Sequence, residues 1–169
     1  KVLINTPSIS REEGDATDKL QLFIERGAPV QCEVHRHLNN LWCVAPGYDP
    51  SRPTLLLDAH IDTVKPVSGW SKHPFTPIVE GDRIYGRGTA DDKGPAVVSL
   101  WALKAIKDLG IELNKNARII LGTAEETGSQ DLAYYCQKEA YPPMSFSPDS
   151  SFPVTNIEKG GFGPTLTAN

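Results

Sequence analysis

Two apolar, β-rich runs with an amphipathic segment between them constrain the fold most strongly. The runs cover residues 54–59 and 117–123, and the segment at 95–109 places its apolar residues at helical spacing. Pro95 suits the first turn of that helix, and Gly110 suits its end. Strands that alternate with helices are typical of a mostly parallel mixed sheet flanked by helices. The sequence therefore predicts an α/β fold.

Shorter patterns predict the remaining elements. Ser10 and Glu13 form the S-x-x-E pattern of a capping box, and apolar residues at helical spacing follow it. We therefore expect a helix at about 11–26 that ends at Gly27. The other expected elements are a helix at 130–138 and strands at 31–34, 40–45, 144–146 and 152–158.

Composition and charge restrict the kind of partner. The 169 residues suffice for one domain with a core, and the chain has neither an internal repeat nor a low-complexity tract. Seventeen Lys and Arg against 21 Asp and Glu give a formal net charge of −4 without a basic cluster, which argues against a nucleic-acid or anionic-membrane partner. The partner expected from these properties is a small molecule or a cation.

Cysteines and apolar runs indicate the compartment. Cys32, Cys43 and Cys136 are odd in number and lack C-x-x-C spacing, so they indicate reduced thiols rather than a disulfide framework or a zinc ribbon. The longest apolar runs fall far short of the ~18 residues of a membrane span. We therefore expect a cytoplasmic protein without a membrane partner.

Acidic and histidine side chains cluster where the predicted strands end. His60 and Asp62 follow the first buried strand, Glu125–Glu126 follow the second, and Asp149 follows the strand expected at 144–146. Asp91–Asp92 directly precede the central helix. Ligands of α/β sheets bind beyond the carboxyl ends of the strands, so we expect these clusters to meet in one site.

His60 and Asp62 have the spacing of a metal ligand and its orienting group. In extended backbone, residues two apart share a face, and a metal-bound imidazole usually donates its other N–H to a carboxylate. The alternative is a solvated strand end with a helix-capping aspartate, and this pair alone does not decide between the two.

The glycine-flanked pair Asp91–Asp92 favours a cation over a phosphate. A P-loop ends in Gly-Lys-Ser/Thr, and two carboxylates in the turn would repel a phosphate group. Asp91 is expected to bind metal while Asp92 caps the following helix, and the alternative is that both carboxylates serve only as a capping pair at the helix start. Lys93 is expected to contact substrate or to form an ion pair with a neighbouring carboxylate.

Glu125 and Glu126 suit two separate tasks. Consecutive side chains of an extended segment face opposite ways, so that one can bind metal while the other transfers protons. An imidazole among carboxylates favours zinc, cobalt or manganese over magnesium or calcium. Two metals ~3.5–4 Å apart that activate a water are the arrangement of metal-assisted hydrolases, and the four clusters together indicate that class of reaction.

The segments around these clusters carry a family resemblance over nearly the whole chain. They are Leu57–Val64, Ile84–Gly94, Thr123–Ser129 and Ser147–Asp149. In this order they resemble the motifs of the zinc metallopeptidase family of aminoacylase, carboxypeptidase G, dipeptidase V, acetylornithine deacetylase and succinyl-diaminopimelate desuccinylase. The resemblance implies a zinc exopeptidase-like catalytic domain.

The resemblance also implies the metal ligands. His60, Asp91 and Asp149 would bind the first of two zinc ions, and Asp91 and Glu126 would bind the second, so that Asp91 bridges both. Cobalt or manganese could substitute for zinc.

Two residues are expected to serve catalysis by the same resemblance. Glu125 would be the general base, which takes a proton from a water bridging the two zinc ions and delivers it to the leaving amine. Asp62 would orient the ring of His60. The family also holds a cis peptide at the position of Asp91–Asp92.

The resemblance divides the chain near residue 160. Residues 1–160 correspond to the N-terminal portion of the di-zinc catalytic domain, and residues 161–169 to the start of an inserted lid domain that is otherwise missing. The family's last zinc ligand, a histidine near its C-terminus, has no counterpart in this chain. We therefore expect an incomplete domain with reduced or no activity, and the resemblance leaves open a homodimer of the complete protein through the lid.

The substrate stays open between two branches of the family. Residues 47–53 and 60–66 are more similar to acetylornithine deacetylase, whereas residues 86–159 are more similar to dipeptidase V. The expected reaction is hydrolysis of the amide bond of dipeptides or N-acyl amino acids. The alternative, from another class, is a non-catalytic binding or assembly domain that keeps the fold.

Overall fold

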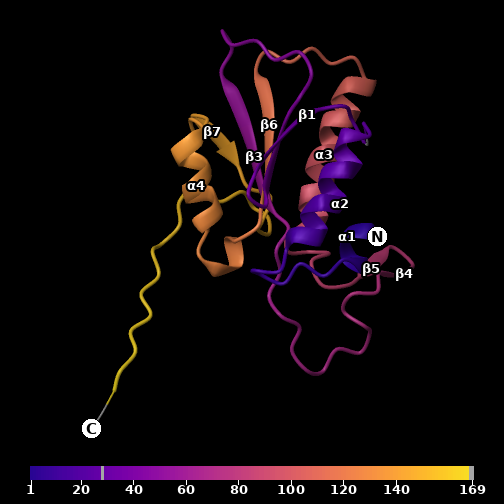
Figure 1. The fold of residues 1–169 in the computed structure, drawn as a ribbon, viewed down its shortest axis with the longest axis vertical. Helices are drawn as coiled ribbons and strands as arrows, with labels where there is room; N and C mark the ends of the chain where they lie inside the picture. Colours follow the sequence, from indigo (N-terminus) through magenta and orange to yellow (C-terminus); the bar gives the residue numbers. More distant parts are fainter. Residues whose placement is uncertain (28, 168–169) are drawn as a thin grey trace.

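A five-stranded sheet with helices on both faces lies at the centre of the computed structural model, which describes residues 1–27 and 29–167 (Figure 1). Its strands are β1 (Glu33–His37), β2 (Asn40–Val44), β3 (Thr54–His60), β6 (Asn116–Gly122) and β7 (Met144–Phe146). The helices are α1 (Val2–Asn5), α2 (Gly14–Glu25), α3 (Lys93–Asp108) and α4 (Gln130–Lys138), with a 3-10 turn η1 at Glu125–Thr127. A separate hairpin consists of β4 (Ile78–Glu80) and β5 (Arg83–Tyr85).

The strand order of the sheet is β1-β2-β6-β3-β7. β3 pairs in parallel with β6 and with β7, and β2 pairs antiparallel with β1 and with β6. Four of the five strands therefore point the same way, with β2 running against them. This confirms the predicted mixed, mostly parallel sheet, and it brings the carboxyl ends of β3, β6 and β7 to one edge.

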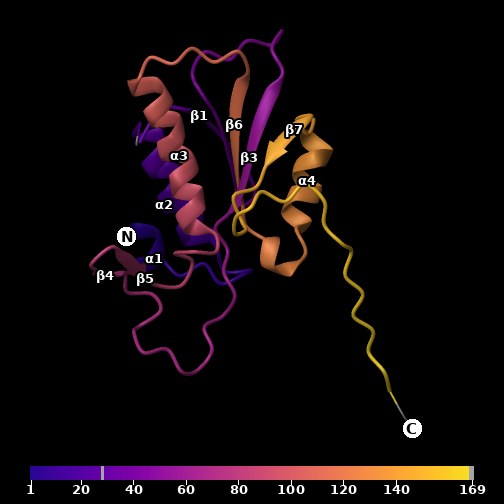
Figure 2. The ribbon, with the colours of Figure 1, turned by 180° about the vertical axis from the view of Figure 1, so that it is seen from behind.

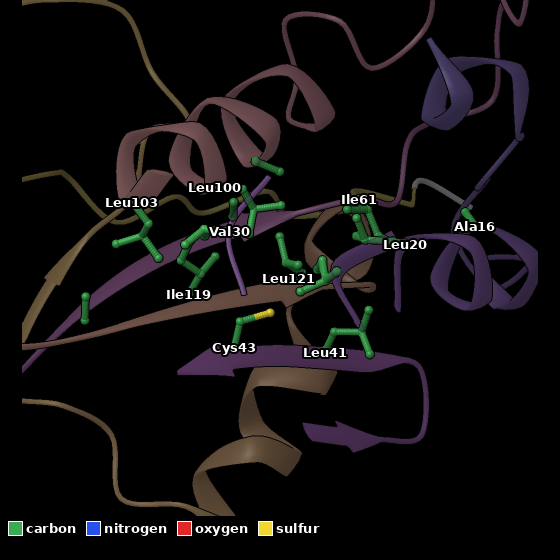
Figure 3. Close-up of a cluster of buried hydrophobic side chains, with 14 residues drawn as sticks. Ala16, Leu20, Val30, Leu41, Cys43, Ile61, Leu100, Leu103, Ile119 and Leu121 are labelled. Atoms are coloured by element: carbon green, nitrogen blue, oxygen red, sulfur yellow. The ribbon is translucent and has the colours of Figure 1, made fainter. Parts of the chain in front are cut away.

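The two faces of the sheet have separate apolar cores, because successive strand residues point to opposite faces. Leu41 and Cys43 of β2 cluster with residues of α2 and α3, whereas Trp42 clusters with Tyr135 of α4. Figure 3 shows the first core, and Figures 1 and 2 show α2 and α3 on one side of the sheet and α4 on the other. The alternation along β2 explains why one strand is buried on both faces.

All three predicted helices are present in the structure, and α2 begins three residues after its predicted start and ends one residue before its predicted end. α4 spans the predicted residues 130–138, and α3 begins two residues before the predicted start at Pro95 and ends one residue before the predicted end. Gly110 follows α3 with φ +64°, a left-handed conformation that glycine adopts without steric cost.

The predicted capping box is wrong. α2 begins at Gly14, and Glu13 occupies its N-cap position without a side-chain capping bond. The Ser10 hydroxyl donates to the Asp62 carboxylate at 2.8 Å instead. The Glu13 carboxylate accepts the backbone N–H of Arg11, a residue whose φ of +81° is not helical. Ser10 and Glu13 therefore form a different local structure from the one that their spacing predicts.

Other differences concern short elements. The sequence patterns do not predict α1 or the hairpin of β4 and β5. The strand predicted at 152–158 is wrong, because these residues are irregular and exposed, and Pro153 lacks the N–H that a strand ladder requires. The five sheet strands begin and end within three residues of their predicted bounds.

Two further predictions concern chemistry and membranes. Cys32, Cys43 and Cys136 are free thiols, as their number and spacing predict. Among the described residues, no helix has both the length and the apolar character that crossing a membrane requires.

Candidate metal centre

The four predicted clusters meet at one edge of the sheet. His60 ends β3, η1 with Glu125 and Glu126 follows β6, and Asp149 lies shortly after β7. Asp91 precedes α3 and reaches the same edge. The parallel pairing of β3 with β6 and β7 produces this convergence, as expected for ligands beyond the carboxyl ends of parallel strands.

The His60 ring lies at the centre of the cluster. Its Nε2 atom lies 3.2 Å from an oxygen of Asp91, 3.5 Å from one of Asp149 and 3.7 Å from one of Glu125. The side chain is 4% exposed, and Nε2 has no hydrogen-bond partner among the described residues. A buried ring nitrogen that faces carboxylate oxygens without a hydrogen bond is suited to bind a cation.

Two groups of ligand atoms share His60. One joins it to Asp91 and Glu126, and the other joins it to Asp92 and Asp149; within each group, the ligand atoms lie within 4.8 Å of one another. The structure therefore brings together all four residues that the resemblance assigns to metal. It also adds Asp92, which sequence analysis treated as a helix cap.

Asp92 occupies the N-cap position of α3 but makes no capping bond with its side chain. Its Oδ2 accepts the backbone N–H of His60 at 2.9 Å, and its Oδ1 is buried without a partner among the described residues. Burial, together with nearby carboxylates, raises the pKa of Asp92 to about 7. The peptide bond between Asp91 and Asp92 is cis, as the resemblance implies. Asp92 is thus a buried support of the His60 backbone.

Asp62 connects three parts of the centre, and its carboxylate is fully buried. Oδ1 accepts the Nδ1–H of His60 and the backbone N–H of Glu125, both at 3.2 Å, and Nδ1 also lies 3.1 Å from the Asp62 carbonyl oxygen. Oδ2 accepts the Ser10 hydroxyl at 2.8 Å and the backbone N–H of Glu126 at 3.3 Å. Burial alone would raise the pKa of Asp62, but the hydrogen bonds from His60 and Ser10 outweigh it and lower the pKa. Asp62 therefore contacts the His60 ring and also the turn that carries both glutamates.

Glu125 and Glu126 lie in the 3-10 turn η1, so the prediction of an extended segment is wrong here. Their side chains do not face opposite ways across a strand. Glu125 approaches Nε2 of His60, and Glu126 groups with His60 and Asp91. Both carboxylates are therefore available to the same centre.

Asp131 supports this turn, and sequence analysis did not single it out. Its Oδ2 accepts the backbone N–H groups of Thr123 at 2.5 Å and Ala124 at 3.1 Å, the two residues before Glu125. Asn40 donates to the Asp131 carbonyl and accepts the Thr123 hydroxyl. The available sequence signal is an acidic residue in the first turn of a predicted helix, which also fits an ordinary helix start.

Among the described residues, Lys93 forms no ion pair with a carboxylate, which was one of its two expected roles. Its Nζ is buried and donates to the backbone carbonyls of Leu3 at 2.8 Å and Thr6 at 3.0 Å. Burial lowers the pKa of Lys93 to about 8. This lysine therefore ties α1 to the start of α3 rather than pairing with a carboxylate.

Burial and crowding shift the pKa values of the centre. Burial raises the pKa of Glu125, Glu126 and Asp149, and neighbouring carboxylates add to the rise. Burial lowers the pKa of His60, but the hydrogen bond to Asp62 and the nearby negative charges outweigh it and raise the pKa to about 9. The cluster of carboxylates therefore stabilises positive charge at its centre.

A cavity of about 200 Å³ adjoins the centre between the sheet and α4. Asp58, His60, Glu125, Asp131 and Asp149 are among its lining residues. The centre thus opens onto a space that acidic side chains and His60 help to line.

A family model and curated proteins match part of this chain. A model of the family described as Peptidase family M20/M25/M40 matches residues 56–162. The Bacillus subtilis (strain 168) protein named "Putative dipeptidase YtjP" is 44% identical over 101 residues, which are 60% of this chain and 22% of that protein. The chain therefore spans about a fifth of the length of the curated relatives that it matches.

Solved structures share the fold. The M20 family metallo-carboxypeptidase Sso-CP2 from Sulfolobus solfataricus has a TM-score of 0.70 at 26% identity, over 86% of this chain and 35% of that one. Human carnosine dipeptidase 1 has a TM-score of 0.67 at 23% identity, over 82% and 34% of the two chains, which is a likeness of fold. The matched residues 56–162 include every acidic and histidine side chain of the centre, and the chain belongs to peptidase family M20/M25/M40.

Proposed function

We propose that this chain is the metal-binding part of a hydrolase that cleaves the amide bond of dipeptides or N-acyl amino acids, with two zinc ions held around His60. The observation that carries the proposal is the buried Nε2 of His60, which lacks a hydrogen bond among the described residues and faces oxygens of Asp91, Asp149 and Glu125 at 3.2–3.7 Å. An imidazole nitrogen and several carboxylate oxygens at one point form a donor set that zinc accepts.

The donors divide between two metal ions. His60, Asp91 and Asp149 would hold the first, and Asp91 and Glu126 the second. Asp91 suits the bridging position because it lies next to His60 and also groups with Glu126. Cobalt or manganese could replace zinc on the same donors. Bound metal would supply Lewis-acid polarisation of the scissile carbonyl and would lower the pKa of a water.

Glu125 is the general base of the proposed reaction. Its side chain is 49% exposed, and one oxygen lies 3.7 Å from Nε2 of His60, so that it reaches both solvent and the space beside the ligands. The raised pKa of Glu125 makes its carboxylate a stronger proton acceptor. In this proposal, Glu125 takes a proton from the attacking water and delivers it to the amine that leaves.

Asp62 prepares His60 for its role as a ligand. When Nδ1 donates to the Asp62 carboxylate, the lone pair of Nε2 is directed to the metal position. The same carboxylate accepts the backbone N–H of Glu125, so one residue orients both the ligand and the base. Asp62 touches no substrate in this scheme and acts by positioning.

The name of the Bacillus subtilis relative favours dipeptides as the substrate class. N-acyl amino acids form the second class to be tested, because the first part of the chain resembles the acetylornithine deacetylase branch. The division of the chain at residue 160, the homodimer of the complete protein and the cytoplasmic location stay predictions.

Metal content and turnover test the proposal together. The 169-residue chain is stripped with a chelator, dialysed against micromolar zinc and analysed by elemental mass spectrometry. Dipeptides and N-acetyl amino acids are then assayed with zinc, cobalt and manganese. We expect at least one bound zinc per chain, and any turnover to be faster on dipeptides.

Each part of the proposal has its own contrary result. The assignment of the metal centre would be contradicted if the chain took up no zinc, or if the His60→Ala variant kept an unchanged zinc content. Turnover of any substrate would contradict the binding-domain alternative, whereas zinc uptake without turnover agrees with both an incomplete catalytic domain and that alternative. Turnover that persists at the same rate in Glu125→Gln would contradict the assignment of Glu125 as the general base.

A further inference from the structure

A short N-terminal segment lies alongside the loop that follows β3. Ile9 and Thr63 form a parallel β-bridge, and the Thr63 N–H donates to the carbonyl of Ser8 at 2.9 Å. We name residues 8–10 the strap. Because residues 61–63 follow His60 directly, the strap supports the backbone on which the proposed ligand and its orienting group lie.

The two serines of the strap contact different kinds of group. The buried Ser8 hydroxyl donates to the backbone carbonyl of Ile61 at 2.5 Å. The Ser10 hydroxyl donates to Oδ2 of Asp62 at 2.8 Å. Ser8 therefore stabilises backbone, whereas Ser10 contacts a side chain of the centre.

We propose that Ser10 is a positioning residue of the metal centre and that it acts through Asp62. The inference rests on the proposed function, which places a metal at His60. Ser10 donates the shortest of the side-chain and backbone hydrogen bonds that the Asp62 carboxylate accepts from the described residues. A serine that sequence analysis assigned to a helix cap thus has a place in the support of the site.

The effect of Ser10 follows from the geometry of the carboxylate. Without the hydroxyl, Oδ2 of Asp62 keeps the backbone N–H of Glu126 at 3.3 Å as its donor among the described residues. Rotation of the carboxylate about its Cβ–Cγ bond then meets less resistance. Such rotation moves Oδ1 away from Nδ1 of His60 and from the Glu125 N–H. Among the described residues, Nδ1 then keeps only the Asp62 carbonyl oxygen at 3.1 Å as its acceptor, so both the ligand and the base are held less tightly.

The position of the strap is fixed from a second side. Lys93 donates to the carbonyls of Leu3 and Thr6, just before the strap, and it directly follows Asp92. The N-terminal segment therefore contacts two of the loops that carry the centre. This anchoring lets a single hydroxyl in the strap hold a constant direction toward Asp62.

Zinc affinity in a set of serine variants tests the inference. The dissociation constant is measured by competition with a chromophoric chelator for the unchanged chain, Ser10→Ala, Ser10→Thr and Ser8→Ala. We expect Ser10→Ala to weaken binding by about 10-fold, the lower end of the ~10–100-fold loss typical when an outer hydrogen-bond partner of a ligand is removed. Ser10→Thr keeps the hydroxyl and should restore most of the affinity.

Ser8→Ala is the matched control, because it loses a hydroxyl from the same strap without touching Asp62. Thermal unfolding of each metal-free variant measures the purely structural cost. Equal affinity losses in Ser8→Ala and Ser10→Ala, or an unchanged affinity in Ser10→Ala, would overturn the inference. If Ser10→Ala does not fold, Ser10→Gly replaces it, since glycine also lacks the hydroxyl and adds no metal ligand.

A second readout separates this inference from the proposed function. Long-range ¹H–¹⁵N spectra of the metal-free chain report the environment of His60 Nδ1. We expect this signal to shift in Ser10→Ala and to stay unchanged in Ser8→Ala. If the unchanged chain binds no zinc, the proposed function fails while this shift still confirms the link from Ser10 to His60. An unmoved signal in Ser10→Ala refutes the link.

Discussion

The candidate centre has a buried half and an open half. In the buried half, the side chains of His60 and Asp62 are 4% and 0% exposed, and Asp92 is fully buried. In the open half, the side chains of Asp91 and Glu125 are 61% and 49% exposed. We define the buried half as His60, Asp62 and Asp92, and the open half as Asp91, Glu125, Glu126 and Asp149.

The two halves differ in what sets their geometry. The buried half is joined internally, because Asp92 accepts the His60 N–H and the His60 ring donates to Asp62. The open half consists of carboxylates on loops, and burial and mutual repulsion raise the pKa of Glu125, Glu126 and Asp149. Folding therefore orients the buried half, whereas a bound cation would relieve the repulsion in the open half. Substitutions in the two halves should have different consequences.

The largest expected effect belongs to the open half. Glu125→Gln should lower any zinc-dependent turnover by about 10²–10⁴-fold, because the amide cannot accept the proton. The free energy of unfolding should change by less than about 0.5 kcal/mol, as is usual for exposed side chains. Steady-state kinetics and urea unfolding of the same sample check both values. A large loss of stability would show that Glu125 contributes to the stability of the fold, and it would contradict the distinction between the buried half and the open half.

In the buried half, His60→Ala should abolish tight zinc binding. The loss should exceed the ~10–100-fold that removal of an outer partner causes, because the ligand itself is removed. At a zinc concentration 100 times Kd, the unchanged chain should gain about 2.7 kcal/mol of stability and the variant almost none. Thermal unfolding with and without zinc measures this difference.

His37→Ala is the matched control for that experiment. His37 lies on β1 against Trp42, and the two ring centroids are 4.6 Å apart. Its removal should leave the zinc-induced stabilisation unchanged. An equal loss in both histidine variants would mean that the zinc effect does not come from the centre.

A smaller effect concerns the support of the turn that carries Glu125 and Glu126. Asp131→Ala leaves the N–H groups of Thr123 and Ala124 without their carboxylate, so we expect a destabilisation of about 1–3 kcal/mol. Asp108→Ala, which removes an exposed partner of Lys104, should cost no more than about 0.5 kcal/mol. Urea unfolding of both variants measures the two changes in the free energy of unfolding. Equal costs would place Asp131 among ordinary surface residues.

The smallest effect probes the core behind the buried half. Burial raises the pKa of the Cys43 thiol to about 12, whereas Cys136 is exposed on α4. Because the thiolate is the reactive form, Cys43 should stay unlabelled by a maleimide at pH 7–8 while Cys136 reacts. Peptide mass spectrometry locates the label. Labelling of both cysteines at similar rates would show that the core opens readily and that the buried half does not keep a fixed geometry.

Much of the site could be predicted before the fold was known. His60, Asp91, Glu126 and Asp149 lie after predicted strands or before a predicted helix, and the structure brings them to one edge. For His60, Glu126 and Asp149, this convergence follows because parallel strands place their carboxyl ends together, which is a general property of such sheets. Chemical type and position along the chain were sufficient for these residues.

The supporting residues could not be predicted in the same way. Ser10 and Glu13 match a capping box, yet the Ser10 hydroxyl donates to Asp62, 52 residues away in sequence. Asp131 matches an ordinary helix start, yet it holds the segment before Glu125. A serine or an aspartate has the same hydrogen-bonding groups in either role. The partner depends on what the folded chain brings within reach.

The sequence by itself determined the alternation of strands and helices and the chemical identity of the proposed ligands, because periodicity and residue type are local properties. The tertiary structure alone decided that Asp92 accepts the His60 backbone N–H, that Glu125 and Glu126 share a turn, and that the Ser10 hydroxyl donates to Asp62. Such choices depend on contacts between residues far apart in the chain, and local preference does not contain them.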